Sequence, residues 1–236
     1  MKWILSIALI HFAAAYCLAD DAASAAAALR SKGDVKGARA LLAEALSKAP
    51  RAIERAPLAQ ALAETDLDLS RFEEAIKEGA ACATLFASLA DHAHEVDCLT
   101  VIGQGHAARG DFPAATEAFQ KAITTARQYN LPWNEATLLN NLGSVRFLAG
   151  DYSAVHGLYL DAEQLVQRHS GESWAPRLDQ LTRANLAGLY QRLGQYPRAL
   201  DIYRTLEEAL RNEPATRARM LSNICLLYTS PSPRDS

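Results

Sequence analysis

The sequence predicts an all-α fold, a right-handed α-solenoid of helix–turn–helix repeats. Hydrophobic residues make up 50% of the chain but aromatic residues only 7%, and glycine and proline fall mostly between apolar runs, where they end helices. A small residue, a turn glycine, an aromatic residue and an alanine recur in the same order along the chain. Because each such hairpin leaves one apolar face uncovered, successive hairpins must stack, and stacking produces a solenoid.

The clearest copy of this pattern covers residues 139–162, LNNLGSVRFLAGDYSAVHGLYLDA. Gly143 is the small residue at which two helices cross closely, because a larger side chain there would overpack the crossing. Gly150 allows the first helix to end in a left-handed cap. Tyr152 then begins the second helix, which reaches Ala162.

Five copies follow one another, and a sixth begins at residues 223–224. Their small residues are spaced by 37, 40, 40 and 44 residues, and they are Ala26, Ala63, Gly103, Gly143 and Ala187. Their turn positions are Gly33, Ser70, Gly110, Gly150 and Gly194. The extra residues in the longer copies fall after the second helix.

This order of residues resembles the tetratricopeptide (TPR) repeat, whose usual period is about 34 residues. The longer period is similar to that of the TPR variants found in kinesin light chains and many bacterial sensor proteins, and LNNLG at 139–143 and ANLA at 184–187 fit that variant. The resemblance covers residues 22–224. It implies a scaffold that binds a protein or an extended peptide.

The first nineteen residues predict a secretory signal peptide. Lys2 supplies a positive charge, Trp3 to Tyr16 is almost continuously apolar, and Ala19 is a small residue suited to cleavage. We therefore expect a secreted or periplasmic bacterial protein whose mature chain begins at Asp20. The apolar run is shorter than the roughly 20 residues of a membrane span, but an uncleaved anchor stays open as an alternative.

The other end of the sequence interrupts the repeat pattern. Residues 225–235, CLLYTSPSPRD, resemble one reading frame of a sequencing-library adapter and arrive where a helix of the sixth repeat should continue. We expect residues 225–236 to be a disordered, non-native tail, and residues 20–224 to be the TPR solenoid. An ordinary Ser/Pro-rich terminus is the alternative.

No motif for catalysis, for a metal site or for a cofactor emerges from the sequence. Asp91 to Glu95 is the only dense group of possible metal ligands, but His92 and His94 are two residues apart and point to different sides of a helix. Nucleophile-elbow, zinc-protease and phosphate-loop motifs are absent from the sequence. The formal net charge of −3 comes from interspersed acids and bases, so we expect no nucleic acid as a partner and no membrane contact beyond the signal peptide.

Two of the four cysteines, Cys82 and Cys98, belong to the predicted repeats. They fall on the second helix of one copy and the first helix of the next, which are neighbours in a solenoid. A disulfide between them is possible in an oxidising compartment. Burial as free thiols is the alternative, because cysteine is a common small core residue and the sequence does not fix the Cα separation that a disulfide requires.

The expected binding surface is the concave groove lined by the first helices of the repeats. Asn141 and Asn185 occur at the same repeat position, and an asparagine there often contacts the peptide backbone in TPR domains that bind extended peptides. An amide group both donates and accepts hydrogen bonds, which suits a main-chain ligand. The side chains expected beside them are Asn140, Gln104, Gln191 and Arg192. Asparagines that simply face water are the alternative.

These features predict a protein- or peptide-binding scaffold of the bacterial cell envelope, without an enzyme in this segment. Two other classes of function stay open. The chain can be the sensor region of a longer protein with a caspase-like protease, kinase or cyclase domain. It can also be a structural protein that uses its solenoid to oligomerise.

Overall fold

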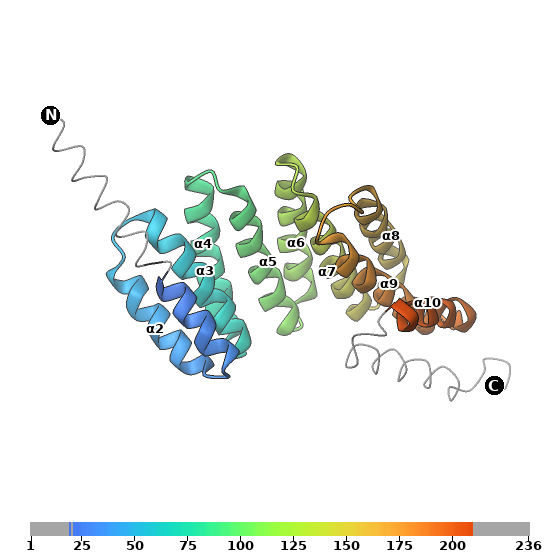
Figure 1. Cartoon of the computed structure of the whole chain (residues 1–236), viewed down its shortest axis with the longest axis horizontal. Coiled ribbons are helices and arrows are strands. Elements are labelled where there is room, and N and C mark those ends of the chain that lie inside the picture. The colour runs from blue at the N-terminus through green and yellow to red at the C-terminus, as the bar shows by residue number, and fades with distance from the viewer. Residues whose placement is uncertain (1–18, 20, 210–236) are drawn as a thin grey trace. The chain divides into compact units, whose positions relative to one another are not determined.

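The computed structural model describes Ala19 and residues 21–209, which form helices and turns without a strand among them. A first helix covers residues 21–31. The helices that follow (Figure 1) are α2 (Val35–Lys48), α3 (Ala52–Asp68), α4 (Phe72–Ser88), α5 (His92–Ala108), α6 (Phe112–Gln128), α7 (Pro132–Leu148), α8 (Tyr152–Arg168), α9 (Ala175–Arg192) and α10 (Tyr196–Ala209). The all-α prediction is confirmed.

The chain divides into two compact units, Met1–Asn134 (unit 1) and Glu135–Ser236 (unit 2). Within unit 1, each helix from α2 to α5 packs against the helix that follows it, up to the α5–α6 pair, and α3 also packs against α5, the first helix of the following hairpin. Within unit 2, α9 packs against both α8 and α10. Contacts between neighbouring hairpins, and not only within them, define a solenoid, so that prediction is also confirmed.

The hairpins turn at the predicted positions. Each turn residue has a positive φ, and these residues are Gly33, Ser70, Gly110, Gly150 and Gly194. Ser70, with φ 57°, shows that a residue with a side chain is accepted at this position. Several helices are also capped at their first turn, because the carboxylates of Asp34 and Asp111 accept hydrogen bonds from the backbone N–H groups of Gly37 and Ala114.

The predicted small residues lie where helices cross. A Cβ atom added at Gly103 would lie 2.6 Å from a ring atom of Phe119 in unit 1. In unit 2, a Cβ atom at Gly143 would overlap the ring of Tyr159. Both rings are almost fully buried. The close approach of each helix pair therefore depends on the missing side chain.

Unit 1 also contains a buried ionic cluster. Asp66 on α3 is 0% exposed, and its carboxylate is 2.5 Å from Arg39 Nε on α2 and 3.3 Å from Arg71 Nε before α4. The two guanidinium groups compensate the charge that burial would otherwise penalise. Three consecutive helical segments are thus joined at one carboxylate.

The two ends of the sequence lie outside the described residues. The predicted signal peptide up to residue 18, the start of a sixth repeat and the adapter-like tail are therefore predictions still, as are the domain limits at residues 19 and 224. None of the helices described here is both long and apolar enough to span a membrane.

Candidate functional site

Two equivalent rows of side chains in unit 2 form the candidate binding surface. One row lies on α7 and the other on α9, and in both the residues recur every three or four positions, which places them on one face of a helix. We call them the first-helix rows, and they consist of Thr137, Asn141, Ser144 and Leu148 on α7, and of Leu181, Asn185, Gly188 and Arg192 on α9. None of these eight residues is fully buried.

Hydrogen bonds between α7 and α9 hold the two rows side by side. Asn140 Nδ2 donates to Thr182 Oγ1 at 2.8 Å and to the carbonyl oxygen of Ala136 at 3.0 Å. Asn185 Nδ2 in turn donates to Asn140 Oδ1 at 3.1 Å, and Thr182 Oγ1 donates to the Leu178 carbonyl. This chain of bonds fixes the register of one repeat on the next.

The structure corrects the role expected for Asn140. Its side chain is 1% exposed, and both its amide nitrogen and its amide oxygen are engaged within the protein. A ligand on the surface cannot reach it, because the helix turns of α7 and α9 enclose it. Asn140 is a packing residue of the repeat interface and does not belong to the ligand-contact set.

Asn141 and Asn185 occupy matching places in the two rows, and both are half-buried. Asn185 Nδ2 donates one hydrogen bond to Asn140 Oδ1, and the amide oxygen of Asn185 accepts none of the side-chain hydrogen bonds of the described chain. Asn141 takes part in none of the side-chain hydrogen bonds of the described chain, so its whole amide is available. The two amides therefore differ: Asn141 can donate and accept, whereas Asn185 chiefly accepts.

Gln191 and Arg192 lie at the C-terminal end of α9. Gln191 Oε1 accepts a hydrogen bond from Tyr203 OH at 3.5 Å, and Arg192 Nε donates to Tyr152 OH at 2.8 Å. The Arg192 guanidinium also lies 5.7 Å from the centre of the Tyr152 ring, a cation–π distance. Because Arg192 is exposed, it keeps donors for an anionic group while its position is fixed.

The rows of unit 2 also contain two large apolar side chains that the sequence analysis missed. Leu148 is 64% exposed and Leu181 is 48% exposed. Both could have been found by stepping three or four residues along each helix from Asn141 and Asn185. Exposed leucines beside amides and a cation offer both apolar and polar contacts to one ligand.

Gln104 belongs to unit 1, where it is exposed on α5 at the repeat position of Ser144. Unit 1 has no asparagine at the repeat position of Asn141, because Ala61 on α3 and Val101 on α5 occupy it. The face of unit 1 is instead acidic. Arg30 bridges Glu64 at 3.1 Å and Asp68 at 2.7 Å on α3.

Asp97 adds to this acidic face on α5. Burial raises the pKa of its carboxyl group above the usual value, and the charges of Glu64 and Asp91 act in the same direction. His94 and a hydrogen bond from Asn134 Nδ2, at 3.0 Å, oppose the rise. Asp97 therefore holds its proton to a higher pH than an exposed aspartate.

Cys82 on α4 and Cys98 on α5 are both 0% exposed, and their sulfur atoms are within bonding distance, with the Cα atoms separated by 6.0 Å. The Cα distance is one that a disulfide spans without backbone movement. Adjacent helices thus bring the two residues together as expected, in the core and away from the surface rows. The disulfide between them joins the second repeat to the third.

The histidines between Asp91 and Glu95 serve the start of α5. Asp91 caps the helix by accepting a hydrogen bond from the backbone N–H of His94. His92 stacks on Tyr129 with ring centres 3.4 Å apart, and its Nδ1 lies 2.8 Å from Glu95. Among the residues described by the structure, no group of three or more His, Cys, Asp or Glu side chains is arranged to hold a metal ion.

Comparison with known proteins gives a family match and a shared fold. A tetratricopeptide-repeat family model matches residues 181–206, which lie in α9, α10 and the turn between them. Among curated protein sequences, none matches this one.

The solved structures that are similar to the chain include the following three. A Signal Transduction ATPase with Numerous Domains (STAND) protein with a tetratricopeptide repeat sensor, from Pyrococcus horikoshii, has a TM-score of 0.74 at 16% identity over 88% of this chain and 32% of its own. A Rap protein complexed with competence and sporulation factor has a TM-score of 0.69 at 16% identity, over 86% and 56%. The nearly identical TPR-like repeats of a Podosopora anserina kinesin light chain give 0.67 at 16%, over 83% and 96%.

The chain spans about a third of the length of the STAND protein and just over half of the Rap protein. At these identities the likeness concerns the fold, and two of the three structures are described as containing tetratricopeptide or TPR-like repeats. Residues 181–206 thus match a tetratricopeptide repeat, and the chain shares the fold of solved tetratricopeptide-repeat structures, with hairpin turns at the predicted positions.

Proposed function

We propose that the chain is a non-catalytic scaffold that binds an extended peptide segment of a partner protein along the first-helix rows of unit 2. The observation that carries this proposal is that an asparagine recurs at one repeat position. The amide of Asn141 makes no side-chain hydrogen bond within the described chain, and the amide of Asn185 makes one, to Asn140. An extended backbone presents N–H and C=O groups at regular intervals, and two amides at equivalent repeat positions match such a ligand.

The remaining members of the rows favour the same kind of ligand. Gly188 and Ser144 are small, so a main chain can approach α7 and α9 closely at their middle. Leu148 and Leu181 supply apolar contacts, and Arg192 supplies a positive charge. We therefore expect a peptide with apolar side chains and a carboxylate near the end that meets Arg192.

The similar structures support this direction without naming a partner. The Rap structure holds a competence and sporulation factor, and the TPR fold is typically a non-catalytic scaffold. The STAND protein, whose repeats are described as a sensor, supports the second reading, in which the chain is the sensor region of a longer signalling protein. In both functions the partner would bind along the first-helix rows of unit 2.

We also propose that the protein is exported. Lys2, the apolar run and the small residues before Asp20 support this location. The buried pair of Cys82 and Cys98 is compatible with an oxidising compartment. Mass spectrometry of protein recovered from the periplasm of a bacterial host should find a chain that begins at Asp20; an intact Met1 in the membrane fraction would argue against export.

The binding proposal is tested with peptides selected from a random-sequence phage library on the full chain. Isothermal titration then compares the best peptide on the wild-type chain and on Asn141→Ala/Asn185→Ala. Two lost hydrogen bonds of about 0.5–1.5 kcal/mol each should weaken binding about tenfold or more. Gln164→Ala is the matched control, because it removes an exposed amide from the second helix α8.

Equal affinity for the double variant and the wild type would overturn the assignment of the rows. Arg192→Ala provides an independent arm, since it should weaken peptides that carry a carboxylate and leave the affinity of their amidated forms unchanged. Circular dichroism of every variant checks that helicity is retained.

A further inference from the structure

The hydrogen bond that Asn185 makes within unit 2 fixes which way round its amide lies. Its Nδ2 donates to Asn140 Oδ1 at 3.1 Å, and Asn140 is itself held by bonds to Thr182 and to the Ala136 carbonyl. The nitrogen of Asn185 is therefore directed at the repeat interface, and its oxygen is the atom left for a ligand. Because an amide oxygen only accepts, the ligand must present an N–H group at this place.

The spacing of adjacent first helices selects the conformation of that ligand. Helices in direct contact, as α7 and α9 are, lie about 8–10 Å apart. In a β-strand, residues on the same face are only about 6.4–6.8 Å apart, and an α-helical ligand bonds its N–H groups internally. In a polyproline II segment, every third residue faces the same side, at a spacing of about 9.3 Å, and the N–H groups stay unbonded. Polyproline II therefore matches the repeat of Asn141 and Asn185.

Gly188 leaves room for a main chain beside Asn185. Glycine is unfavourable inside a helix, and at Gly103 and Gly143 the reason for it is an aromatic ring that a Cβ atom would overlap. At Gly188 the packing gives no such reason, because an added Cβ atom would lie 4.0 Å from Tyr203 OH, its nearest described neighbour. Gly188 follows Asn185 by one helical turn in the same row. A glycine with open space above it, next to an available amide oxygen, suits the close approach of a ligand backbone.

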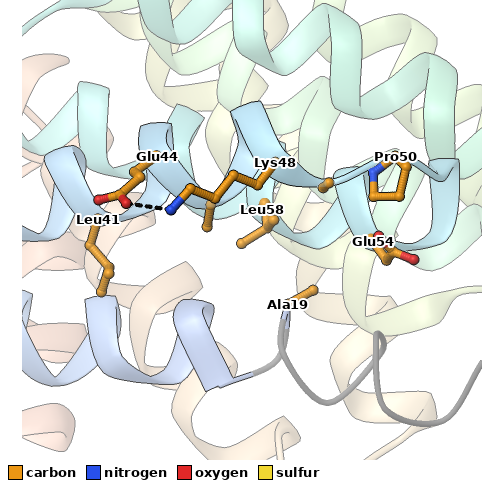
Figure 2. A pocket seen from close by; sticks show the side chains of 9 residues that line it. Ala19, Leu41, Glu44, Lys48, Pro50, Glu54 and Leu58 are labelled. Atoms are coloured by element: carbon orange, nitrogen blue, oxygen red, sulfur yellow. Dashed lines mark hydrogen bonds and ion pairs between the residues drawn. The ribbon is translucent and has the colours of Figure 1, made fainter. Parts of the chain in front are cut away.

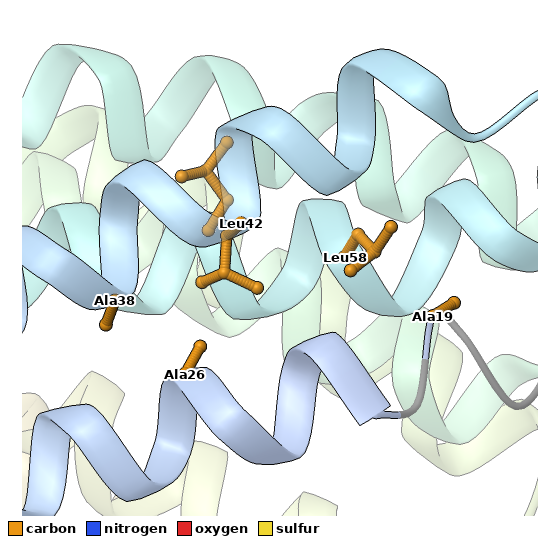
Figure 3. Packing of buried hydrophobic residues seen from close by; sticks show 6 residues of the cluster. Ala19, Ala26, Ala38, Leu42 and Leu58 are labelled. Carbon is orange, nitrogen blue, oxygen red and sulfur yellow. The ribbon is translucent and has the colours of Figure 1, made fainter.

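The pocket of unit 1 is chemically different and does not suit a main chain. It has a volume of about 410 Å³ and lies between Ala19, the end of α2 and the start of α3 (Figure 2). Its charged side chains are already paired, Glu44 with Lys48 and Glu54 with Arg51. The apolar residues around it belong to one core cluster (Figure 3). Since no asparagine or glutamine lines this pocket, the rows of unit 2 are the better place for a ligand backbone.

We propose, on the basis of the peptide-binding function proposed for unit 2, that the peptide crosses α7 and α9 as a polyproline II segment. One residue with a backbone N–H faces Asn185, and the third residue from it faces Asn141. Because the free amide of Asn141 both donates and accepts, the residue that faces it can be proline, which keeps its carbonyl group. The two residues between them face neither asparagine and can be proline as well. Proline is thus accepted throughout this segment except opposite Asn185.

A backbone scan of the best phage-selected peptide on the full chain tests the required N–H group. Each peptide amide in turn is replaced by an ester, which removes one N–H without adding bulk, and isothermal titration measures the affinity. One ester should weaken binding about tenfold, and this loss should vanish on Asn185→Ala. If no ester effect depended on Asn185 while Asn141→Ala/Asn185→Ala still weakened the parent peptide, this inference would be overturned and the proposed function would stand. If the parent peptide were also indifferent to the double variant, both would fail.

A proline scan of the same peptide tests the conformation. Proline placed one, two or three residues from the ester-sensitive position, on the side toward Asn141, should leave the affinity within about twofold of the parent, because proline favours polyproline II in the free peptide. Proline at the sensitive position itself should weaken binding as the ester does. Ester sensitivity at every second residue, or loss of binding with proline at the intervening positions, would indicate a strand and overturn the proposal.

Gly188→Ala tests the close approach of the backbone with two measurements that should move in opposite directions. The added methyl group occupies the space of the ligand, so the same peptide should bind about tenfold more weakly. The melting temperature should rise, because alanine is the better helix former. Gly157→Ala on α8, where a Cβ atom also meets nothing within 4 Å, is the matched control and should raise the melting temperature without changing the affinity. Wild-type affinity for Gly188→Ala would overturn the placement of the main chain beside Asn185.

Discussion

Replacing Asn140 with alanine should destabilise unit 2, whereas the same change at the next residue should not. Asn140 is 1% exposed and takes part in three hydrogen bonds, to Thr182 Oγ1, to the Ala136 carbonyl and from Asn185 Nδ2. Asn141 is half-buried and lies outside this network. The two substitutions remove identical atoms, so any difference between them comes from the surroundings.

The expected loss follows from what each partner can do afterwards. A buried hydrogen bond contributes about 0.5–1.5 kcal/mol net, and an orphaned buried group costs more. Thr182 Oγ1 keeps its bond to the Leu178 carbonyl, and the half-exposed amide of Asn185 can bind water. Asn140→Ala therefore loses the equivalent of one to two buried hydrogen bonds and leaves a small cavity. Together these should lower the free energy of unfolding by about 2–3 kcal/mol.

Urea unfolding followed by far-UV circular dichroism measures this difference. Asn141→Ala should stay within about 0.5 kcal/mol of the wild type, as surface substitutions usually do. Asn140→Ala should also leave the affinity for a selected peptide unchanged at temperatures where the fold is intact. If both variants lost the same stability, or if Asn140→Ala lost none, the assignment of Asn140 to the repeat interface would be wrong.

Three further results are expected. Reducing the Cys82–Cys98 disulfide should lower the free energy of unfolding by about 3 kcal/mol, the chain-entropy value for a loop of this size. Urea titrations with and without reductant measure this difference, and a Cys82→Ala/Cys98→Ala variant should show no effect of the reductant. Gly103→Ala should lower the free energy of unfolding by about 1–3 kcal/mol, because the added Cβ atom meets the Phe119 ring. Gly157→Ala, whose Cβ atom would have no neighbour within 4 Å, should stabilise α8 by roughly 0.5–1 kcal/mol. Thermal melts in which Gly157→Ala is the less stable variant would refute the argument about helix crossings. Because burial raises the pKa of Asp97 in the folded chain, its contribution to stability should fall as pH rises from the ordinary carboxyl pKa through the raised value; Asp97→Asn should flatten that part of the profile, and an unchanged profile would contradict it.

The sequence by itself determined the repeat and its period. A turn residue with positive φ and a small residue at the helix crossing are local or nearest-neighbour requirements. They recur in each described hairpin, and their positions can be predicted without knowing the fold. Gly110 and Gly150 adopt positive φ as expected, and Gly103 meets the ring of its own hairpin. Ser70 follows the same rule although it is not a glycine, because its register, not its identity, places it at the turn.

Only the tertiary structure separated Asn140 from Asn141. Adjacent residues on a helix point about 100° apart, and which direction leads to the neighbouring hairpin depends on how α7 and α9 pack. Repeat position alone made both asparagines look like ligand contacts. The same reasoning applies to Ala19, whose small size indicates a cleavage site in the sequence, while its burial against Leu42 and Leu58 makes it part of the first repeat. Burial and hydrogen-bond partners are properties of packed helices, and they exist only once the hairpins have stacked.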